Sequence, residues 1–328
     1  MAEWAPGGLE DDVRPRMFAA AEAGQPFALA TIVDADGGPR PLGSQMVVTA
    51  DAAWGFLSGG CIEDDVALHA RAALADGAPR TLVYGRGSPF IDMRLPCGGR
   101  IEVMVERVSA DDPALARLRE LTARRVPALW ESDGRRRSCA PEYDGRATRP
   151  SLSLRRVYQP QQRLIVVGTD PFALATASMG AQIGWDTTLL SPFGPAAEPP
   201  VEVRCDRRPV AAALEELAPD AWTAIAVVTH DLAADQEALA PALRSSAGYV
   251  GVVGSRRRLP ERIEGLRRAG LTEAEIERLR APIGLPIRAQ SPWEVAVAVA
   301  GEIVALAHGT DPENGLPLPR SFSVAHAH

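Results

Sequence analysis

A cysteine that follows two glycines is the first feature of the chain able to do chemistry. The segment from Ser58 to Glu63 reads Ser-Gly-Gly-Cys-Ile-Glu, between an expected strand and an expected helix. Paired glycines such as Gly59 and Gly60 let the backbone turn sharply and approach a ligand closely, and N–H groups at a helix start favour anions and thiolates. Cys61 is therefore a candidate reactive thiol, although Glu63 would oppose a thiolate. A small buried cysteine at a helix cap is the simpler interpretation of this segment alone.

A second glycine–cysteine turn lies about 35 residues later, where Leu95 to Gly99 reads Leu-Pro-Cys-Gly-Gly before an expected strand. Two such turns in one small domain are consistent with one pocket lined by the sulfurs of Cys61 and Cys97 and by backbone N–H groups. Neither cysteine has a partner two to four residues away, and no histidine has finger-like spacing, which disfavours zinc. A disulfide between them stays open in principle, although a reducing compartment argues against it.

Polar residues also follow the expected strands of the second half. Thr229, His230 and Asp231 come at the carboxyl end of one strand, which is where ligands bind in open α/β sheets. His230 and Asp231 are the candidate catalytic pair if the chain is an oxidoreductase. A structural or helix-capping histidine is the alternative.

A glycine–serine turn with three arginines follows the next expected strand. Gly254 and Ser255 precede Arg256, Arg257 and Arg258. A glycine and a serine at a helix start, joined by arginines, form an anion or phosphate site. A solvated helix face is the alternative for the arginines.

The first strand of this half ends in an altered dinucleotide turn. Gly168 is followed by Thr-Asp-Pro, so Asp170 stands where a dinucleotide fold has a glycine against the pyrophosphate. Asp170 with Pro171 also makes a good helix start. Ser191 stands where an acidic residue would bind a ribose. Both departures weaken the case for a nicotinamide nucleotide.

Two patterns of elements must position these residues. The first half reads as a mixed α/β domain, with helices expected over 9–23 and 62–75 and strands over 27–33, 45–49, 53–57, 80–84 and 100–106. The second half alternates strands, at 163–167, 187–190, 224–228 and 249–253, with helices. Near-continuous apolar strands alternating with helices predict a parallel sheet covered on both faces, in a Rossmann-like domain.

The predicted organisation is an α/β chain of two domains. An N-terminal domain spans 1–131, a polar segment at 132–160 is a linker or a long hairpin tip, a Rossmann-like domain spans 161–310, and a tail covers 311–328.

Composition excludes some classes of protein. The 328 residues are 46% hydrophobic and 23% charged, with a formal net charge of -7, which disfavours sequence-independent nucleic-acid binding. No apolar run reaches the roughly 18 residues of a membrane span, and the acidic N-terminal segment lacks the features of a signal peptide. We therefore expect a cytoplasmic protein. Four cysteines are too few for a disulfide framework in a chain of this size.

The two glycine–cysteine turns resemble those of the XdhC/CoxI family. The motifs SGGCIE and LPCGG before an IEV strand, with RPLGSQM upstream, are similar to the N-terminal domain of that family. The motifs THDLAADQEAL, YVGVVGSRRR and APIGLPI with a trailing helix resemble its C-terminal Rossmann domain. The resemblance covers about 10–108 and 160–308. The chain departs from the family at Asp170, at Ser191 and at Arg280, where a histidine is common.

The resemblance implies a molybdenum-cofactor chaperone that protects the cofactor during sulfuration and delivers it to an apo molybdenum hydroxylase. Cys61 would be the cofactor ligand or guard, in contact with metal only through the molybdenum of the cargo. The implied binding residues are Arg40, Gly43, Gly59, Gly60, Cys61, Cys97, Gly98, Gly99, Gly168, Gly254, Ser255, Arg256 and Arg257.

The implied partners are the apo enzyme and a cysteine desulfurase, and a homodimer stays open. Two other functions also stay open: an NAD(P)-dependent oxidoreductase that uses the second domain, and a non-catalytic assembly scaffold.

Overall fold

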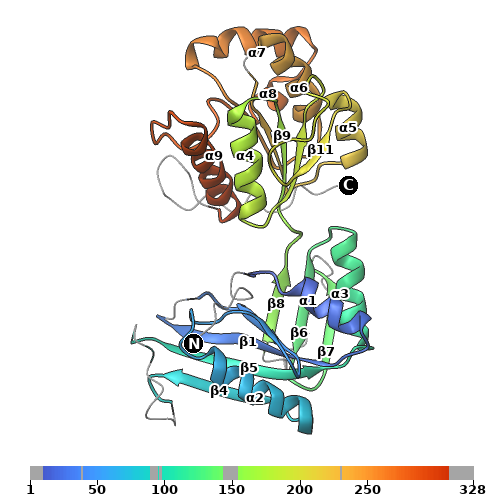
Figure 1. Cartoon of the computed structure of the whole chain (residues 1–328), viewed down its shortest axis with the longest axis vertical. Coiled ribbons are helices and arrows are strands. Elements are labelled where there is room, and N and C mark those ends of the chain that lie inside the picture. The colour runs from blue at the N-terminus through green and yellow to red at the C-terminus, as the bar shows by residue number, and fades with distance from the viewer. Residues whose placement is uncertain are drawn as a thin grey trace. The chain divides into compact units, whose positions relative to one another are not determined.

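The computed structural model describes residues 10–37, 40–88, 95, 98–142, 154–229 and 231–309. Two of the predicted site residues, Cys97 and His230, lie outside these ranges. The chain divides into two compact units, residues 1–160 and 161–328; the first holds two sheets and the second holds one (Figure 1). Of the described helices, none is long and apolar enough to cross a membrane.

The first unit is built on a five-stranded antiparallel sheet in the order β3-β2-β1-β5-β4. Its long central pair is β1 and β5, which run side by side with one register shift between Ile32 and Asp34. The strands are β1 (Phe27–Asp36), β2 (Gln45–Val48), β3 (Ala53–Gly55), β4 (Arg80–Gly85) and β5 (Arg100–Val108).

Both faces of this sheet are covered, which explains its near-continuous apolar strands. Alternate residues of β1, such as Ala28 and Ala30, face the helix α2 (Glu63–Asp76), while Phe27 and Leu29 face the opposite layer. That second layer contains α1 (Arg14–Glu22), α3 (Pro113–Ala123) and a small sheet (Figure 1). A period of two in side-chain direction places each set on its own face.

The small sheet has the order β7-β6-β8 and is antiparallel. It consists of β6 (Ala128–Ser132), β7 (Arg137–Pro141) and β8 (Leu154–Tyr158). The segment 132–160, predicted as a linker or a hairpin tip, therefore carries two strands. Its many arginines hide the alternation, because β7 is only half-buried and places no apolar run in the sequence.

The second unit is a parallel sheet in the order β11-β10-β9-β12-β13-β14. Counted within the unit, this is the 3-2-1-4-5-6 order of a dinucleotide-binding fold, so the Rossmann prediction is confirmed. The strands are β9 (Arg163–Val167), β10 (Asp186–Leu190), β11 (Arg204–Asp206), β12 (Thr223–Val227), β13 (Tyr249–Val252) and β14 (Leu279–Arg280).

Helices cover the two faces of this sheet in separate groups. On one face α4 (Pro171–Gln182) lies beside α9 (Pro292–Ala307), as Figure 1 shows. The other face carries α5 (Val210–Leu217), α6 (Leu232–Arg244), α7 (Leu259–Arg268) and α8 (Glu273–Ile276), with the short 3-10 helix η2 (Arg256–Arg258) before α7.

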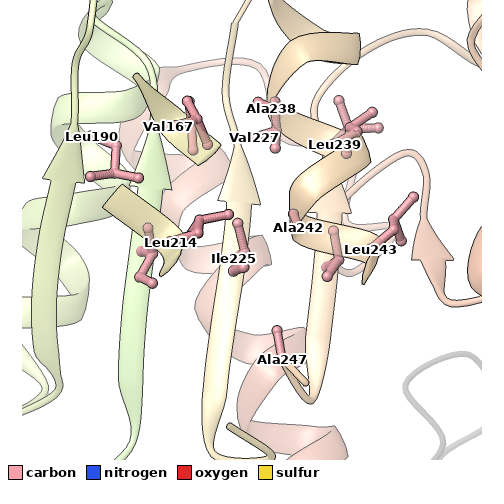
Figure 2. Close-up of a cluster of buried hydrophobic side chains, with 14 of the residues drawn as sticks. Val167, Leu190, Leu214, Ile225, Val227, Ala238, Leu239, Ala242, Leu243 and Ala247 are labelled. Atoms are coloured by element: carbon pink, nitrogen blue, oxygen red, sulfur yellow. The ribbon is translucent and has the colours of Figure 1, made fainter. Parts of the chain in front are cut away.

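The core under the second group is drawn in Figure 2. Val167, Ile225 and Val227 project from β9 and β12 toward Leu214 of α5 and Leu239 of α6. The next residues along the same strands, among them Val166 and Ala226, face α4 and α9 instead. The chain leaves β9 toward one face and β12 toward the other, so the carboxyl ends of these two neighbouring strands form the topological switch point.

Candidate functional site

Cys61 lies in the loop between β3 and α2, and its side chain is exposed. The thiol is free, as are those of Cys139 and Cys205. Burial raises the pKa of the Cys139 thiol to about 12, so that sulfur is not a thiolate at neutral pH. Of the described cysteines, Cys61 alone is exposed to a ligand.

The loop around Cys61 is wrapped about the carboxylate of Glu63, the first residue of α2. Oε1 accepts the backbone N–H groups of Leu57 at 2.9 Å, Ser58 at 2.7 Å and Gly59 at 3.2 Å. Oε2 accepts the N–H groups of Gly60 at 2.9 Å and Ile62 at 3.1 Å. These donors form an anion-binding loop that is filled by a side chain of the protein itself.

The hydroxyl of Ser58 closes the same loop. It donates to Oε2 of Glu63 at 2.8 Å and accepts the N–H of Cys61 at 3.0 Å. Every backbone N–H from Leu57 to Ile62 is thereby bonded within the loop. The N–H groups of Gly59 and Gly60, which the sequence predicted would face a ligand, instead hold Glu63.

Burial alone would raise the pKa of Glu63, but the hydrogen bonds from Ser58, Leu57 and Ile62 outweigh it and hold the pKa below its usual value. Glu63 is therefore ionised at neutral pH. The carboxylate stands just after the thiol in the chain and fixes the backbone on both sides of Cys61.

The two glycines are required by backbone conformation rather than by packing. Gly59 has φ +91° and Gly60 has φ +108°, and a Cβ on either would meet no atom within 4 Å. This left-handed conformation lets successive N–H groups converge on one carboxylate.

The second turn is described only in part. Gly98, with φ +72°, donates its N–H to the carbonyl of Leu95 at 2.9 Å. A Cβ on Gly99 would lie 2.4 Å from the carbonyl oxygen of Gly37, so Gly99 allows the ends of β1 and β5 to approach closely. Backbone conformation explains Gly98 and close packing explains Gly99. The proximity of Cys97 to Cys61 stays a prediction.

Arg40 and Gly43 belong to the segment between β1 and β2. The Arg40 guanidinium stacks 4.3 Å from the ring centre of Phe56 and is ion-paired with Asp11. Its Nε is buried and has no hydrogen-bond partner among the described residues. Gly43 donates to the carbonyl of Ile32 at 2.9 Å with φ +82°, so it serves the turn. A role of either in cofactor binding stays a prediction.

In the second unit, residues of the turn after β9 disfavour phosphate binding at the start of α4. Asp170 caps α4 by accepting the N–H of Ala173 at 2.9 Å, and Pro171 at the first helical position has no N–H to offer. A pyrophosphate at this helix start would meet a carboxylate where it needs donors. This geometry disfavours the oxidoreductase that the sequence left open.

Gly168 is needed for packing. A Cβ there would lie 2.1 Å from the carbonyl oxygen of Val228 and 2.8 Å from the Cβ of Ala173. Gly168 therefore brings the first turn close to the end of β12, and its backbone lines a pocket at the switch point.

Behind the turn after β12 lies a buried ion pair that the sequence did not suggest. The Nε and Nη2 of Arg262 donate to Oδ2 of Asp235 at 2.9 and 2.6 Å, and Nη2 also donates to the carbonyl of Val253 at 3.0 Å. Thr229 donates its hydroxyl to Oδ1 of Asp235 at 2.5 Å. Asp231, predicted to be catalytic, caps α6 by accepting the N–H of Ala234 at 2.8 Å.

The glycine–serine–arginine turn also differs from a built phosphate site. Gly254 makes room for Arg262, whose guanidinium nitrogens lie 2.5 Å from the position of a Cβ. Ser255, Arg256 and Arg257 are exposed. The arginine that is fixed in place here is Arg262, held by Asp235, rather than those predicted from the motif.

A pocket of about 450 Å³ lies at the switch point of the second unit. It brings together two of the predicted residues, Gly168 and Asp231, with the departure residue Asp170. Its lining residues are Val167, Gly168, Thr169, Asp170, Pro192, Phe193, Val210, Val228, Thr229, Asp231, Ala234 and Glu237. Within the described ranges, no group of three or more histidine, cysteine or carboxylate side chains could hold a metal ion.

Sequence reasoning therefore missed Glu63 as the organiser of the thiol loop, Asp235 with Arg262, and the pocket residues Phe193 and Glu237. The sequence pattern that could have predicted the role of Glu63 is a glutamate at a helix start, three residues after a pair of glycines. No local sequence pattern predicts the ion pair between Asp235 and Arg262, because the two residues are 27 positions apart in the chain.

Comparisons with known proteins agree over both units. A family model described as the XdhC and CoxI family matches residues 20–85, and one described as the XdhC Rossmann domain matches residues 164–303. The chain is 31% identical to the molybdenum cofactor insertion chaperone PaoD of Escherichia coli strain K12, across 94% of this chain and 93% of that protein.

Two further relatives are more distant. A probable xanthine dehydrogenase subunit from Bacillus subtilis strain 168 is 26% identical, across 84% of this chain and 92% of that protein. A solved structure named a xanthine dehydrogenase of Bacillus halodurans matches with a TM-score of 0.68 and 23% identity, covering 90% of this chain and 95% of that one. At that identity the match supports the fold alone.

Proposed function

Because the chain belongs to the XdhC and CoxI family, we propose that it is a chaperone that inserts molybdenum cofactor into an apo molybdenum hydroxylase of the xanthine dehydrogenase type. The cargo would be protected while a terminal oxo ligand on its molybdenum is exchanged for sulfur. The sulfur would come from a cysteine desulfurase, which would be a second partner. The observation that carries the proposal is the exposed thiol of Cys61, on a loop whose backbone is held by the Glu63 carboxylate.

The residues of that loop fit a soft metal better than a phosphate. A thiolate is a ligand that a sulfur-coordinated metal accepts, and Cys61 is exposed on its loop. The backbone N–H groups beside it are bonded to Glu63, so they do not offer a phosphate site. Cys61 would therefore approach the metal end of the cargo, and its phosphate would be held elsewhere.

Glu63 fixes the backbone on both sides of Cys61, through the N–H groups of Gly60 and Ile62. A chaperone must release its cargo, so the contact that Cys61 makes with the metal would be transient.

The proposal is tested by delivery. The purified chain, loaded with cofactor in the presence of a cysteine desulfurase and a sulfur source, is mixed with an apo molybdenum hydroxylase, and activation of that enzyme is followed in time. We expect activation to exceed that given by free cofactor and to fall with Cys61→Ala. Equal activation with and without the chain would reject the chaperone, and retained binding to the apo enzyme alone would indicate a scaffold.

A further inference from the structure

The pocket at the switch point has an unusual balance of charge for a nucleotide-binding fold. Asp170, Asp231 and Glu237 line it, and none of its described lining residues is basic. A volume of about 450 Å³ lies within the range of small-molecule sites, roughly 300–1,000 Å³. The pocket is therefore large enough for a ligand but electrostatically hostile to a phosphate.

The three carboxylates are not equivalent. Asp170 and Asp231 each use one oxygen to cap a helix, through the N–H groups of Ala173 and Ala234. Glu237 makes no hydrogen bond or ion pair to any residue that the structure describes, and it is exposed. Glu237 follows Ala234 by three residues on α6, and Ala234 follows the capping residue Asp231 by three, so the three positions share the side of the helix that lines the pocket.

Apolar side chains form the rest of the wall. Val167, Val210 and Val228 are buried at the carboxyl end of the sheet and the start of α5. Phe193, which follows β10, lines the same pocket although the residue is 75% exposed. A large aromatic group left in solvent beside an apolar recess is suited to stack on a flat ring.

We propose that this pocket binds a flat heterocycle through a 2-amino-4-oxopyrimidine edge, with Glu237 as the acceptor and Phe193 stacked on the ring. That edge presents an amino N–H and a ring N–H side by side, and a carboxylate accepts such a pair with its two oxygens. The same edge occurs in pterins and in guanine. The ring would enter the recess, and any phosphate attached to it would point out of the pocket, away from Asp170 and Asp231.

This inference deepens the proposed function, since the cargo proposed above contains a pterin, but it does not depend on delivery. Ring binding is measured on the full chain without molybdenum and without an acceptor enzyme. If the chain binds the ring but fails to deliver cofactor, the ring-binding pocket is supported and the chaperone function is rejected. If it delivers cofactor but does not bind the ring, the chaperone function is supported and the ring-binding pocket is rejected.

The test compares four probes by isothermal titration calorimetry: 6-hydroxymethylpterin, guanosine, inosine and guanosine 5′-monophosphate. Inosine lacks the amino group, so we expect it to bind at least about tenfold more weakly than guanosine, the effect of one hydrogen bond to a charged group. The monophosphate should bind no better than guanosine. A preference for the pterin over guanosine would assign the site to a pterin ring, and the reverse would assign it to a nucleotide base.

Two variants and one control locate the interaction. Glu237→Gln should abolish the preference for guanosine over inosine, and Phe193→Ala should weaken both ligands. Glu264→Gln, at an exposed glutamate of α7 outside the pocket, should change neither. Equal affinity for guanosine and inosine, an unchanged preference in Glu237→Gln, or no binding of any ring at millimolar concentration would overturn the proposal.

Discussion

Both oxygens of the Glu63 carboxylate are held by Ser58: Oε1 accepts its backbone N–H at 2.7 Å and Oε2 accepts its hydroxyl at 2.8 Å. This pair joins the end of the loop before the glycines to the first turn of α2, with Cys61 between them. The position of the thiol thus depends on the side chain of Glu63, which follows Cys61 by two residues.

Replacing Glu63 by Gln should loosen this loop. An amide has one acceptor oxygen, and its NH2 group would face N–H donors, so several of the bonds to Leu57, Gly59 and Gly60 would be lost. We expect the free energy of unfolding to fall by about 1–3 kcal/mol. Amide hydrogen exchange should become faster from Ser58 to Ile62. Asp64→Asn is the matched control, since Asp64 is exposed in the same first turn; an equal loss in both variants would contradict the role of Glu63.

The same carboxylate predicts a pH dependence. The folded state lowers the pKa of Glu63, so the ionised form is favoured by folding. Its contribution to stability is complete above the ordinary glutamate pKa of about 4.3 and is lost as the pH falls through the lower pKa of the folded protein. Denaturant titrations at several pH values should show the difference between wild type and Glu63→Gln shrinking below about pH 4. A difference that stays constant down to the lowest pH would contradict this.

The buried pair in the second unit should be more costly to break. Asp235→Asn leaves the Arg262 guanidinium, on a side chain that is only 4% exposed, without its anion. Removing one partner of a buried pair destabilises by about 3–5 kcal/mol. Thermal unfolding of the variant should show that loss, while Glu273→Gln, which breaks the exposed pair with Arg267, should cost about 1 kcal/mol or less. Similar effects for the two variants would show that Asp235 does not hold Arg262.

The altered turn after β9 gives a prediction about nucleotides. The wild-type chain should not bind NADH, because Asp170 occupies the N–H of Ala173 and presents a carboxylate to a phosphate. Asp170→Gly removes both obstacles, although Pro171 still lacks an N–H. We expect the variant to gain weak NADH binding, visible as enhanced cofactor fluorescence. Tight NADH binding by wild type would restore the oxidoreductase hypothesis.

The parts of the fold predicted best are those fixed by buried strands. The runs at 163–167 and 224–228 are buried on both faces, and β9 and β12 fall on them within one residue. The strands β11 and β14 were missed because they have three and two residues at the sheet edges. β7 and β8 were hidden among arginines whose pairing depends on β6.

The candidate site was predicted less completely, for a physical reason. The sequence identified Cys61 and its glycines but assigned their N–H groups to a ligand, because it cannot show which acceptor a loop folds around. From the sequence, Glu63 was expected only to oppose thiolate formation at Cys61. Pocket residues such as Phe193 and Glu237 come from separate elements, and only the strand order brings them together.

The most direct test of the account is cofactor capture by Cys61. Wild type, Cys61→Ala and the control Cys205→Ala are incubated with released molybdenum cofactor, purified again, and analysed for molybdenum and pterin. We predict near-stoichiometric molybdenum and pterin on wild type and on the control, and loss of molybdenum from Cys61→Ala. Equal molybdenum on wild type and Cys61→Ala, or no cofactor on any folded variant, would contradict the account.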